Sequence, residues 1–425
     1  MSSTTPSFPP PPPTTPNTTS PKRALISGAG LAGPSIAFWL SKIGYTCTIV
    51  ERAPSLRANG QQIDVREQGI EAVKRMGLLD ELRKHTVDEA GLQFVDINGK
   101  RKAFFGKNDS GRGRQSFTSE FEIMRGNFCD MLFEQTKDFT EYRFDTMVTG
   151  FENFDDRVVV KFSRGVEESF DILIAADGHR SKIRQMMLKD FGEEQSRHLG
   201  IFGAFFTIPR TEQDENIGTF CNAPGARSML TRWHSPDQGQ GYLFTTSHPE
   251  EFKAVANEGP QKQKELLTRV FSDMGAQTAR LVEGMNAADD FYYQELVQLR
   301  SSTWSRGRVV LLGDAGYAPS PLTGFGTSLA LIGSYVLAGE LSEHGDDVPA
   351  ALKSYETKLR PFIEKTQKLP PGVPGIAYPV SQFGVTVLQT ILGVISGLKI
   401  DKMVQYVLPE NSNSWKLPDY SRLVL

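Results

Sequence analysis

The sequence predicts an α/β protein in which a Rossmann-like parallel-sheet domain is interrupted by an inserted antiparallel-sheet domain and followed by a C-terminal helical segment. Three observations lead to this prediction. Residues 22–53 have the pattern strand, glycine-rich turn, helix, strand, which is one βαβ unit. Residues 197–295 contain several antiparallel strand candidates. After them, the apolar run at 308–313 returns to a buried strand, and helical patterns follow it.

Length, charge and cysteine content limit the possible functions. A chain of 425 residues exceeds one ordinary core, so two domains or one domain with an insertion are expected. The 47 Lys and Arg against 50 Asp and Glu give a net charge of −3, which indicates no bulk attraction to nucleic acid or anionic lipid. The spacing of Cys47, Cys129 and Cys221 fits neither a metal site nor a disulfide scaffold. The six histidines also lack the spacing of metal ligands. We therefore expect a cytoplasmic protein without a structural metal.

Composition and periodicity also divide the chain. Residues 385–400 are the most hydrophobic stretch, but Gln389 and two glycines interrupt it, and it is shorter than the about 20 apolar residues of a membrane span. A buried or interface helix is favoured there, and weak membrane contact stays an alternative. Helices are expected at 68–84, 121–136, 261–271, 328–340 and 349–369. The expected segments are a disordered Pro/Thr-rich tail at 1–21, the first part of the parallel-sheet domain at 22–196 with a hairpin inserted at about 90–115, the antiparallel sheet at 197–295, the second part of the parallel-sheet domain at 296–369, and the C-terminal helical segment at 370–425.

The first glycine turn has the chemistry of a dinucleotide site. Gly28, Gly30 and Gly33 form G-x-G-x-x-G at a strand-to-helix junction, where they allow a sharp turn, close approach of a pyrophosphate and close helix packing. Glu51 ends the second strand, where a carboxylate can accept hydrogen bonds from ribose hydroxyls. The combination favours nucleotide binding over a simple structural turn. Only one such fingerprint is present, so a second dinucleotide would have no fold of its own.

Three motifs together resemble a known family. "GAGLAG" with "ER", "DGHRSKIR" and "GDAGYAPSPLTGFG" occur in the order and spacing of the single-component flavoprotein monooxygenases, the family of para-hydroxybenzoate hydroxylase. That family includes tetracycline-inactivating oxygenases and many hydroxylases of secondary metabolism. The resemblance covers residues 22–369 and implies a Rossmann-like FAD-binding domain whose inserted sheet is the substrate domain. It implies FAD contacts for Gly28, Ala29, Gly30, Ala32, Gly33, Glu51, Arg52, Asp64, Arg125, Asp177, Gly178, Asp314, Gly324, Gly326 and Thr327.

Some of these positions carry further implications. By the resemblance, Asp177 and Gly178 touch both the FAD pyrophosphate and the passing nicotinamide nucleotide, with Ser181 and Arg184 bracing them. Arg57 is implied to contact NAD(P)H. For Arg125 a surface arginine is the alternative, and for the Asp177 turn a plain strand end.

The stretch from Asp314 to Thr327 places helix breakers directly before a helix. By the resemblance, Asp314 binds the ribityl hydroxyls, Pro321 shapes the wall beside the isoalloxazine, and the amides of residues 324–327 point at its pyrimidine edge. A helix start with free N–H groups stabilises a reduced, anionic flavin. The common family pattern differs from this sequence at Gly316, Tyr317, Phe325 and Ser328, which affects side-chain roles but not backbone ones.

No residue is assigned firmly to catalysis. The candidates are Arg227, which the resemblance places facing flavin and substrate, together with Tyr317 and Pro321. A solvated sheet arginine is the alternative for Arg227. Pocket-wall roles are suggested for Phe205, Tyr242 and Phe244, for which a plain core role is the alternative.

The resemblance implies an FAD-dependent monooxygenase that takes hydride from NAD(P)H, adds oxygen at the flavin C4a carbon, and uses the hydroperoxide to hydroxylate or epoxidise an aromatic or polyketide-like small molecule. A flavin oxidase or dehydrogenase of the same fold is the alternative, and a non-enzymatic flavin-binding interaction module is a third. The expected partners are the substrate and molecular oxygen, with no nucleic acid, and the chain is expected to be a monomer or homodimer.

Overall fold

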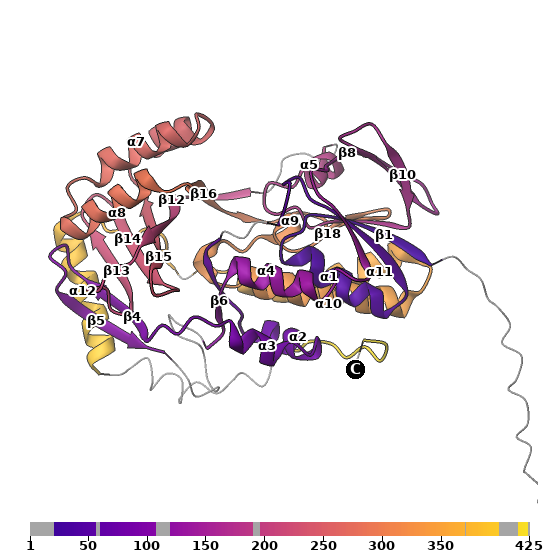
Figure 1. The fold of residues 1–425 in the computed structure, drawn as a ribbon, viewed down its shortest axis with the longest axis horizontal. Helices are drawn as coiled ribbons and strands as arrows, with labels where there is room; N and C mark the ends of the chain where they lie inside the picture. The colour runs from indigo at the N-terminus through magenta and orange to yellow at the C-terminus, as the bar shows by residue number, and fades with distance from the viewer. Residues whose placement is uncertain are drawn as a thin grey trace, which may run out of the picture.

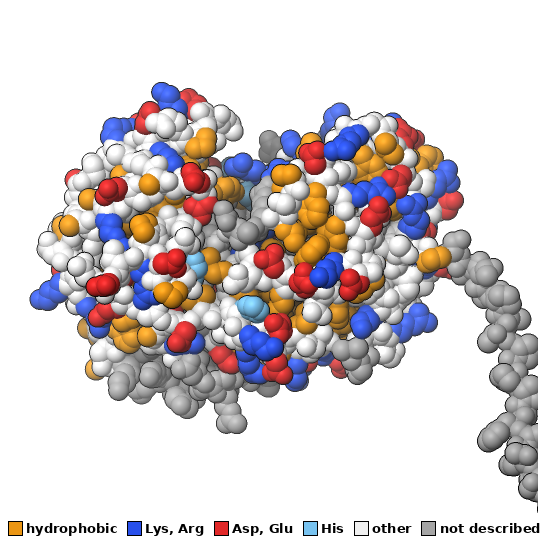
Figure 2. Space-filling view, in the orientation of Figure 1, with side chains coloured by type: hydrophobic (Ala, Val, Ile, Leu, Met, Phe, Trp, Pro, Cys, Tyr) orange, Lys and Arg blue, Asp and Glu red, His pale blue; other side chains and the backbone are white. Residues whose placement is uncertain are grey.

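The computed structural model describes residues 21–56, 60–107, 120–189, 196–369, 371–398 and 415–423. Most of the predicted tail (1–20), the end of the predicted hairpin (108–115) and Arg57 lie outside the described residues. Two lobes form the molecule (Figure 1). In the space-filling view a notch separates them at the upper edge (Figure 2).

The first lobe is built on a six-stranded sheet in the order β17-β18-β11-β1-β2-β7. All its strands run parallel except the edge strand β17. The inner strands are nearly continuous apolar runs because helices and a second sheet cover both faces. The bounds are β1 Lys22–Ser27, β2 Tyr45–Val50, β7 Thr140–Arg143, β11 Ile172–Ala175, β17 Ser305–Arg306 and β18 Val309–Leu311.

Helices and a small sheet surround this parallel sheet. The longest buried helix is α10, of which all residues from Thr327 to Ser342 are buried, as expected for a helix that is apolar all round. It packs against α1, α2 and α11. The bounds are α1 Ala32–Lys42, α2 Gln68–Arg75, α3 Leu79–Lys84, α4 Arg125–Glu134, α5 Lys182–Leu188, α9 Asp314–Tyr317, α10 Gly326–His344 and α11 Val348–Thr366, with the sheet β8 Val148–Asn153, β9 Val158–Phe162 and β10 Glu167–Phe170.

The second lobe is a seven-stranded sheet in the order β16-β12-β15-β14-β13-β4-β5. The hairpin β4–β5, which the sequence places within the first part of the parallel-sheet domain, pairs through β4 with β13 and so extends this sheet. That pairing is the one parallel contact of the sheet. The bounds are β4 Gly91–Val95, β5 Arg101–Gly106, β12 Ser196–Pro209, β13 Gly218–Ala223, β14 Arg227–Trp233, β15 Gln238–Thr245 and β16 Tyr292–Leu299.

Both faces of the second sheet are covered, and alternate residues of each strand face opposite sides. One face packs against α6, α7 and α8. The other face carries Phe205, Tyr242 and Phe244, and Tyr378 packs against it. Helix α12 lies along β5. The bounds are α6 Pro249–Ala254, the short helix η1 Val255–Asn257, α7 Pro260–Phe271, α8 Ala276–Ala287 and α12 Gln382–Gly397.

A two-stranded ladder of β3 (Gln62–Asp64) and β6 (Glu122–Met124) lies between the lobes (Figure 1). The sequence predicted one helix over 121–136, but its first residues form β6 because they pair with β3, and α4 begins only at Arg125. Within the described ranges, no helix is long and apolar enough to cross a membrane.

The C-terminal stretch 415–423 returns to the first lobe. The Tyr420 ring lies on Gly339, where an added Cβ would come within 2.1 Å of it. The Tyr420 hydroxyl donates to Oε1 of the fully buried Glu340, at 2.5 Å, and Lys358 Nζ donates to the same oxygen. This buried carboxylate anchors the chain end to α10.

We expect Tyr420→Phe to lower the free energy of unfolding by about 1.5–3 kcal/mol, because a buried carboxylate loses a hydrogen-bond donor. Urea unfolding at pH 7 measures this loss. Tyr292→Phe, which removes an exposed hydroxyl bonded to Gln294 at 3.2 Å, is the control and should change stability by less than about 0.5 kcal/mol. Equal effects of the two variants would contradict the anchoring role of Tyr420.

Candidate functional site

The first turn of the site needs glycine for steric reasons. Gly28 has φ +111°, and a Cβ there would lie 2.4 Å from the Ala176 carbonyl oxygen. At Gly33 a Cβ would lie 2.0 Å from the Gly28 oxygen, so α1 packs directly on the turn. No side chain caps the start of α1. Its first amides therefore remain open to an external acceptor.

Glu51 is held rigidly at the end of β2. Its Oε2 accepts a hydrogen bond from the Ala29 amide at 3.0 Å, and its Oε1 accepts one from the Ala53 amide at 3.0 Å. Each oxygen keeps a lone pair for a further donor. The neighbouring Arg52 is exposed. The carboxylate is thus fixed beside the first turn before any ligand arrives.

The second turn follows β18 and contains the short helix η2 (Pro321–Thr323). Ser320 precedes it with φ +76° and accepts a hydrogen bond from the Leu322 amide through its side chain. Pro321 is exposed, whereas Thr327, in the first turn of α10, is buried. The first amides of α10 have no acceptor within the helix, so they too are open to a ligand.

Asp314 starts this turn and lies at the floor of a recess. Its side chain is exposed, yet desolvation by the surrounding protein raises the pKa of its carboxyl, with the charge of Arg125 opposing that rise. Because the Asp314 carboxyl is accessible to water and yet surrounded by many protein atoms, it lies in a concave part of the surface. Gly326 lies beside this carboxyl, since a Cβ there would be in ordinary contact with Asp314 Oδ1, at 3.8 Å.

The two turns lie side by side. A Cβ on Gly313 would be 3.4 Å from the Ala32 Cβ at the start of α1. Arg125, the first residue of α4, extends its Nη2 to 3.3 Å from where a Gly30 Cβ would lie. The charge of Arg125 also lowers the pKa of Asp314, so its guanidinium brings positive charge near both turns.

The motif at Asp177–Arg184 joins both turns. Arg184 is buried and donates from Nη1 to the Ala315 carbonyl at 2.8 Å and from Nη2 to the His179 carbonyl at 2.6 Å. Ser181 caps α5 by accepting from the Arg184 amide. Asp177 Oδ2 accepts from the Lys182 amide at 3.0 Å, and burial raises the pKa of the Asp177 carboxyl. The three sequence motifs therefore meet at one place.

Asp64 reaches the site through a residue that sequence reasoning missed. Arg66 donates from Nη2 to Asp64 Oδ2 at 2.7 Å, and its guanidinium carbon would lie 3.1 Å from a Cβ on Gly324. Its amide donates to Ser328 Oγ at 2.8 Å, which gives a role to one of the positions where the sequence departs from the family pattern. The sequence did contain a signal for Arg66: it is two residues after Asp64, and alternate residues of a strand lie on the same face.

An aromatic surface on the second sheet faces away from α6–α8. The Phe205 ring meets Tyr242 and Phe244 edge-on, each at 5.5 Å between centroids, and the last two stack at 6.2 Å. Arg232, on the same face, was also missed. No local signal could have found it, because both faces of this sheet are buried and alternation does not tell them apart.

Two catalytic candidates lie elsewhere. Arg227 faces the helix-covered side, where it donates to the Val270 carbonyl and pairs with Asp273. Tyr317 is 1% exposed, with its hydroxyl 2.8 Å from that of Tyr355 and its ring against Trp304. The sequence prediction placed both residues at the site from their positions along the chain. Strand alternation directs the Arg227 side chain away from it, and the turn of α9 does the same for Tyr317. The structure therefore does not bring Arg227 and Tyr317 to this site.

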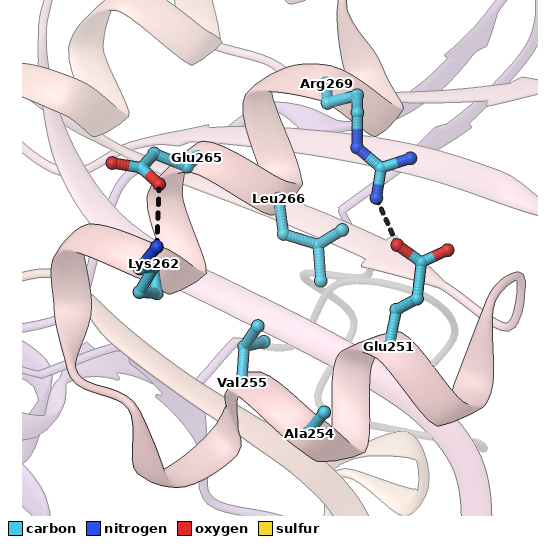
Figure 3. Close-up of a pocket in the computed structure, with 7 residues that line it drawn as sticks. All are labelled: Glu251, Ala254, Val255, Lys262, Glu265, Leu266 and Arg269. Carbon is cyan, nitrogen blue, oxygen red and sulfur yellow. Dashed lines mark hydrogen bonds and ion pairs between the residues drawn. The ribbon is translucent and has the colours of Figure 1, made fainter.

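A separate hollow of about 430 Å³ lies between α6 and α7 (Figure 3). Leu266 and Val255 lie within it, and ion pairs of Arg269 with Glu251 and Lys262 with Glu265 flank it. None of the candidate site residues lines it. In the part of the chain that is described, no group of three or more His, Cys, Asp or Glu is arranged to hold a metal ion.

This arrangement, a βαβ turn and a second turn sharing a recess beside an inserted sheet, defines a flavin-binding oxidoreductase. A family model described as "FAD binding domain" matches residues 22–369. An FAD-dependent monooxygenase of Sarocladium schorii, asL6, is 36% identical over 94% of this chain and 98% of its own length. A flavin-dependent monooxygenase of a Phoma species, eupH, is 37% identical over 94% and 97%.

Solved structures agree. The tetracycline destructase Tet(55) is 29% identical and matches with a TM-score of 0.77 over 94% of this chain and 99% of that one. HpxO of Klebsiella pneumoniae, solved with FAD and uric acid, shares the fold with a TM-score of 0.71 at 21% identity, over 91% and 96%. The chain belongs to the FAD binding domain family and is a flavin-dependent monooxygenase. The predicted family, fold class and FAD dependence are confirmed.

The residues present fit FAD. The open start of α1 and the close approach allowed at Gly30 suit a pyrophosphate, the fixed Glu51 carboxylate suits a ribose, and the Asp314 recess suits a polyol chain.

We expect Asp314→Ala to weaken FAD binding at least about tenfold, or about 1.4 kcal/mol, because the recess loses its acceptor. Titrating FAD into the stripped protein by flavin fluorescence measures the change. Asp346→Ala, which removes a carboxylate that is 97% exposed and pairs with Lys22, is the control and should bind FAD like the unchanged protein. Unaltered affinity in Asp314→Ala would remove Asp314 from the site.

Proposed function

We propose that this monooxygenase uses NAD(P)H and molecular oxygen to hydroxylate or epoxidise an aromatic or polyketide-like small molecule. One observation supports this proposal most directly. The turns after β1, β11 and β18 meet at one recess of the first lobe, and this lobe adjoins the aromatic face of the second sheet. Phe205, Tyr242 and Phe244 offer flat apolar surface on that face, which suits a planar, ring-containing substrate.

For the cofactor we propose the following contacts. The pyrophosphate lies against the amides of Gly28–Gly33 at the start of α1, and Glu51 accepts the ribose hydroxyls. Arg125 adds charge beside the phosphates, and Asp314 accepts the ribityl hydroxyls. The ring lies along Pro321 and the amides of Gly324–Thr327. When bound, FAD supplies the redox chemistry, accepting a hydride and then activating oxygen.

The protein groups support that chemistry by electrostatics and exclusion of water. The start of α10 places the positive end of its dipole and open amides where negative charge collects on a reduced ring. Arg66, close to Gly324, adds a guanidinium at the same edge. The aromatic face excludes water and orients an apolar substrate.

The nicotinamide nucleotide has no fold of its own in this chain, so we propose that it binds transiently beside Asp177 and Gly178. Arg57 remains a proposed contact. We also propose that the protein is cytoplasmic, which the three buried, unpaired cysteines support. A monomer or homodimer remains our proposal for its assembly.

The proposal is tested with a panel of phenols and polycyclic ring compounds. A true substrate should accelerate NAD(P)H consumption, and mass spectrometry under ¹⁸O₂ should find one labelled oxygen atom in the product. Asp314→Ala, depleted of FAD, is the inactive control. Oxidised product without label, together with one peroxide per NAD(P)H or per substrate, would instead establish the oxidase or dehydrogenase alternative.

A further inference from the structure

A cluster of five charged side chains spans the boundary between the lobes. Arg232 of β14 donates from Nη2 to Glu122 Oε2 of β6 at 2.5 Å and from Nε to Glu89 Oε2 at 2.9 Å. The Glu89 and Glu122 side chains are 1% and 2% exposed, and that of Arg232 is 13% exposed. Charges so deeply buried persist only with partners. We call Asp64, Arg66, Glu89, Glu122 and Arg232 the interlobe cluster.

The cluster contains an excess of carboxyl groups. Asp64 and Glu122 are directly opposite each other in the β3–β6 ladder. Like charges in that position repel. Gln62 Nε2 donates to Glu122 Oε2 at 2.7 Å but adds no charge. Among these five described side chains, three carboxyls face two guanidiniums.

Glu122 is the carboxyl whose surroundings favour that proton. Burial, followed by the charges of Asp64 and Glu89, raises the pKa of Glu122 to about 8, although Arg232 opposes the rise. The Tyr242 hydroxyl, on β15, is influenced by the same charges of Arg232, Glu89 and Glu122. The groups facing Glu122 thus come from β3, β14, β15 and the segment before β4.

The far end of the cluster touches the proposed flavin turn. Arg66 is held by Asp64 at 2.7 Å, and its guanidinium lies over Gly324. A continuous series of contacts therefore runs from the substrate sheet through Arg232, Glu122, Asp64 and Arg66 to the turn at Gly324.

We propose that Glu122 is a positioning residue that holds one proton in the interlobe cluster and thereby keeps Arg66 placed at the flavin turn. Loss of the proton adds a negative charge directly opposite Asp64. Repulsion across the β3–β6 ladder then loosens the strand that carries Asp64 and, through it, Arg66. This inference rests on the proposed FAD site and adds a pH dependence to it.

The direction of the pH effect follows from the raised pKa. The protonated cluster is complete well below pH 8 and is lost as the pH rises through that value. If FAD binds the protonated form, its dissociation constant should rise about tenfold between pH 7 and pH 9. Glu122→Gln, a neutral side chain of similar shape, should bind FAD with little dependence on pH over this range.

The experiment measures FAD affinity by flavin fluorescence from pH 6.5 to 9.5 in three proteins. The unchanged protein should show the step, Glu122→Gln should lack it, and Glu120→Gln should retain it. Glu120 is the matched control because it lies two residues earlier and pairs only loosely with Arg83, at 3.8 Å. A step that persists in Glu122→Gln, or a flat profile in the unchanged protein, overturns the proposal.

Two further measurements remain decisive if Glu122→Gln does not fold. Glu89→Gln removes one charge that raises the pKa of Glu122, so the step should move to lower pH, and an unmoved step counts against the cluster. In the unchanged protein, the infrared band of a protonated carboxyl should be present at pH 7 and absent at pH 10. Failure to bind FAD at any pH would refute the proposed function itself, whereas tight binding without a step refutes only this inference.

Discussion

One buried guanidinium, that of Arg184, determines how the turns of the cofactor site lie. Its hydrogen bonds to the carbonyls of His179 and Ala315 tie the segment after β11 to the segment after β18. The strand order β18-β11-β1 places the carboxyl ends of these strands next to one another at one edge of the sheet. Ligands of open α/β sheets bind at such an edge. The place of the site is therefore a consequence of strand order, and Arg184 links two of its three turns.

The backbone part of the site could be predicted from the sequence because its constraints are local. Gly28 adopts a positive φ in the turn, Gly33 packs against the Gly28 oxygen, and Glu51 ends the second strand, all within a single βαβ unit. The face on which a strand side chain lies could not be predicted in the same way. Both faces of the second sheet are buried, so hydrophobic alternation does not distinguish Arg227, under α7, from Arg232, beside the first lobe.

Pairing between distant segments accounts for the other differences from the sequence prediction. The residues at 122–124 have a helical pattern in isolation, but they form β6 because β3 lies alongside. In the same way the hairpin β4–β5 joins the second sheet through β13, which lies more than a hundred residues further along the chain. Nothing in the local sequence of either segment indicates which strand it pairs with. The contacts of Glu122 and Glu89 with Arg232 exist only because of these long-range pairings.

Arg184 and Arg232 therefore have different physical consequences. Arg184 donates to the carbonyls of His179 and Ala315, and neither a carbonyl nor a guanidinium titrates in proteins at ordinary pH, so these two hydrogen bonds do not depend on pH. Arg232 is bound to the carboxyls of Glu89 and Glu122, and burial raises the pKa of Glu122 to about 8, so our proposal assigns the pH dependence to this contact between the lobes. A rigid cofactor recess thus adjoins a junction whose strength can change. In our proposal the protonation of Glu122 therefore acts on FAD binding through Arg66 at Gly324, and not through Arg184.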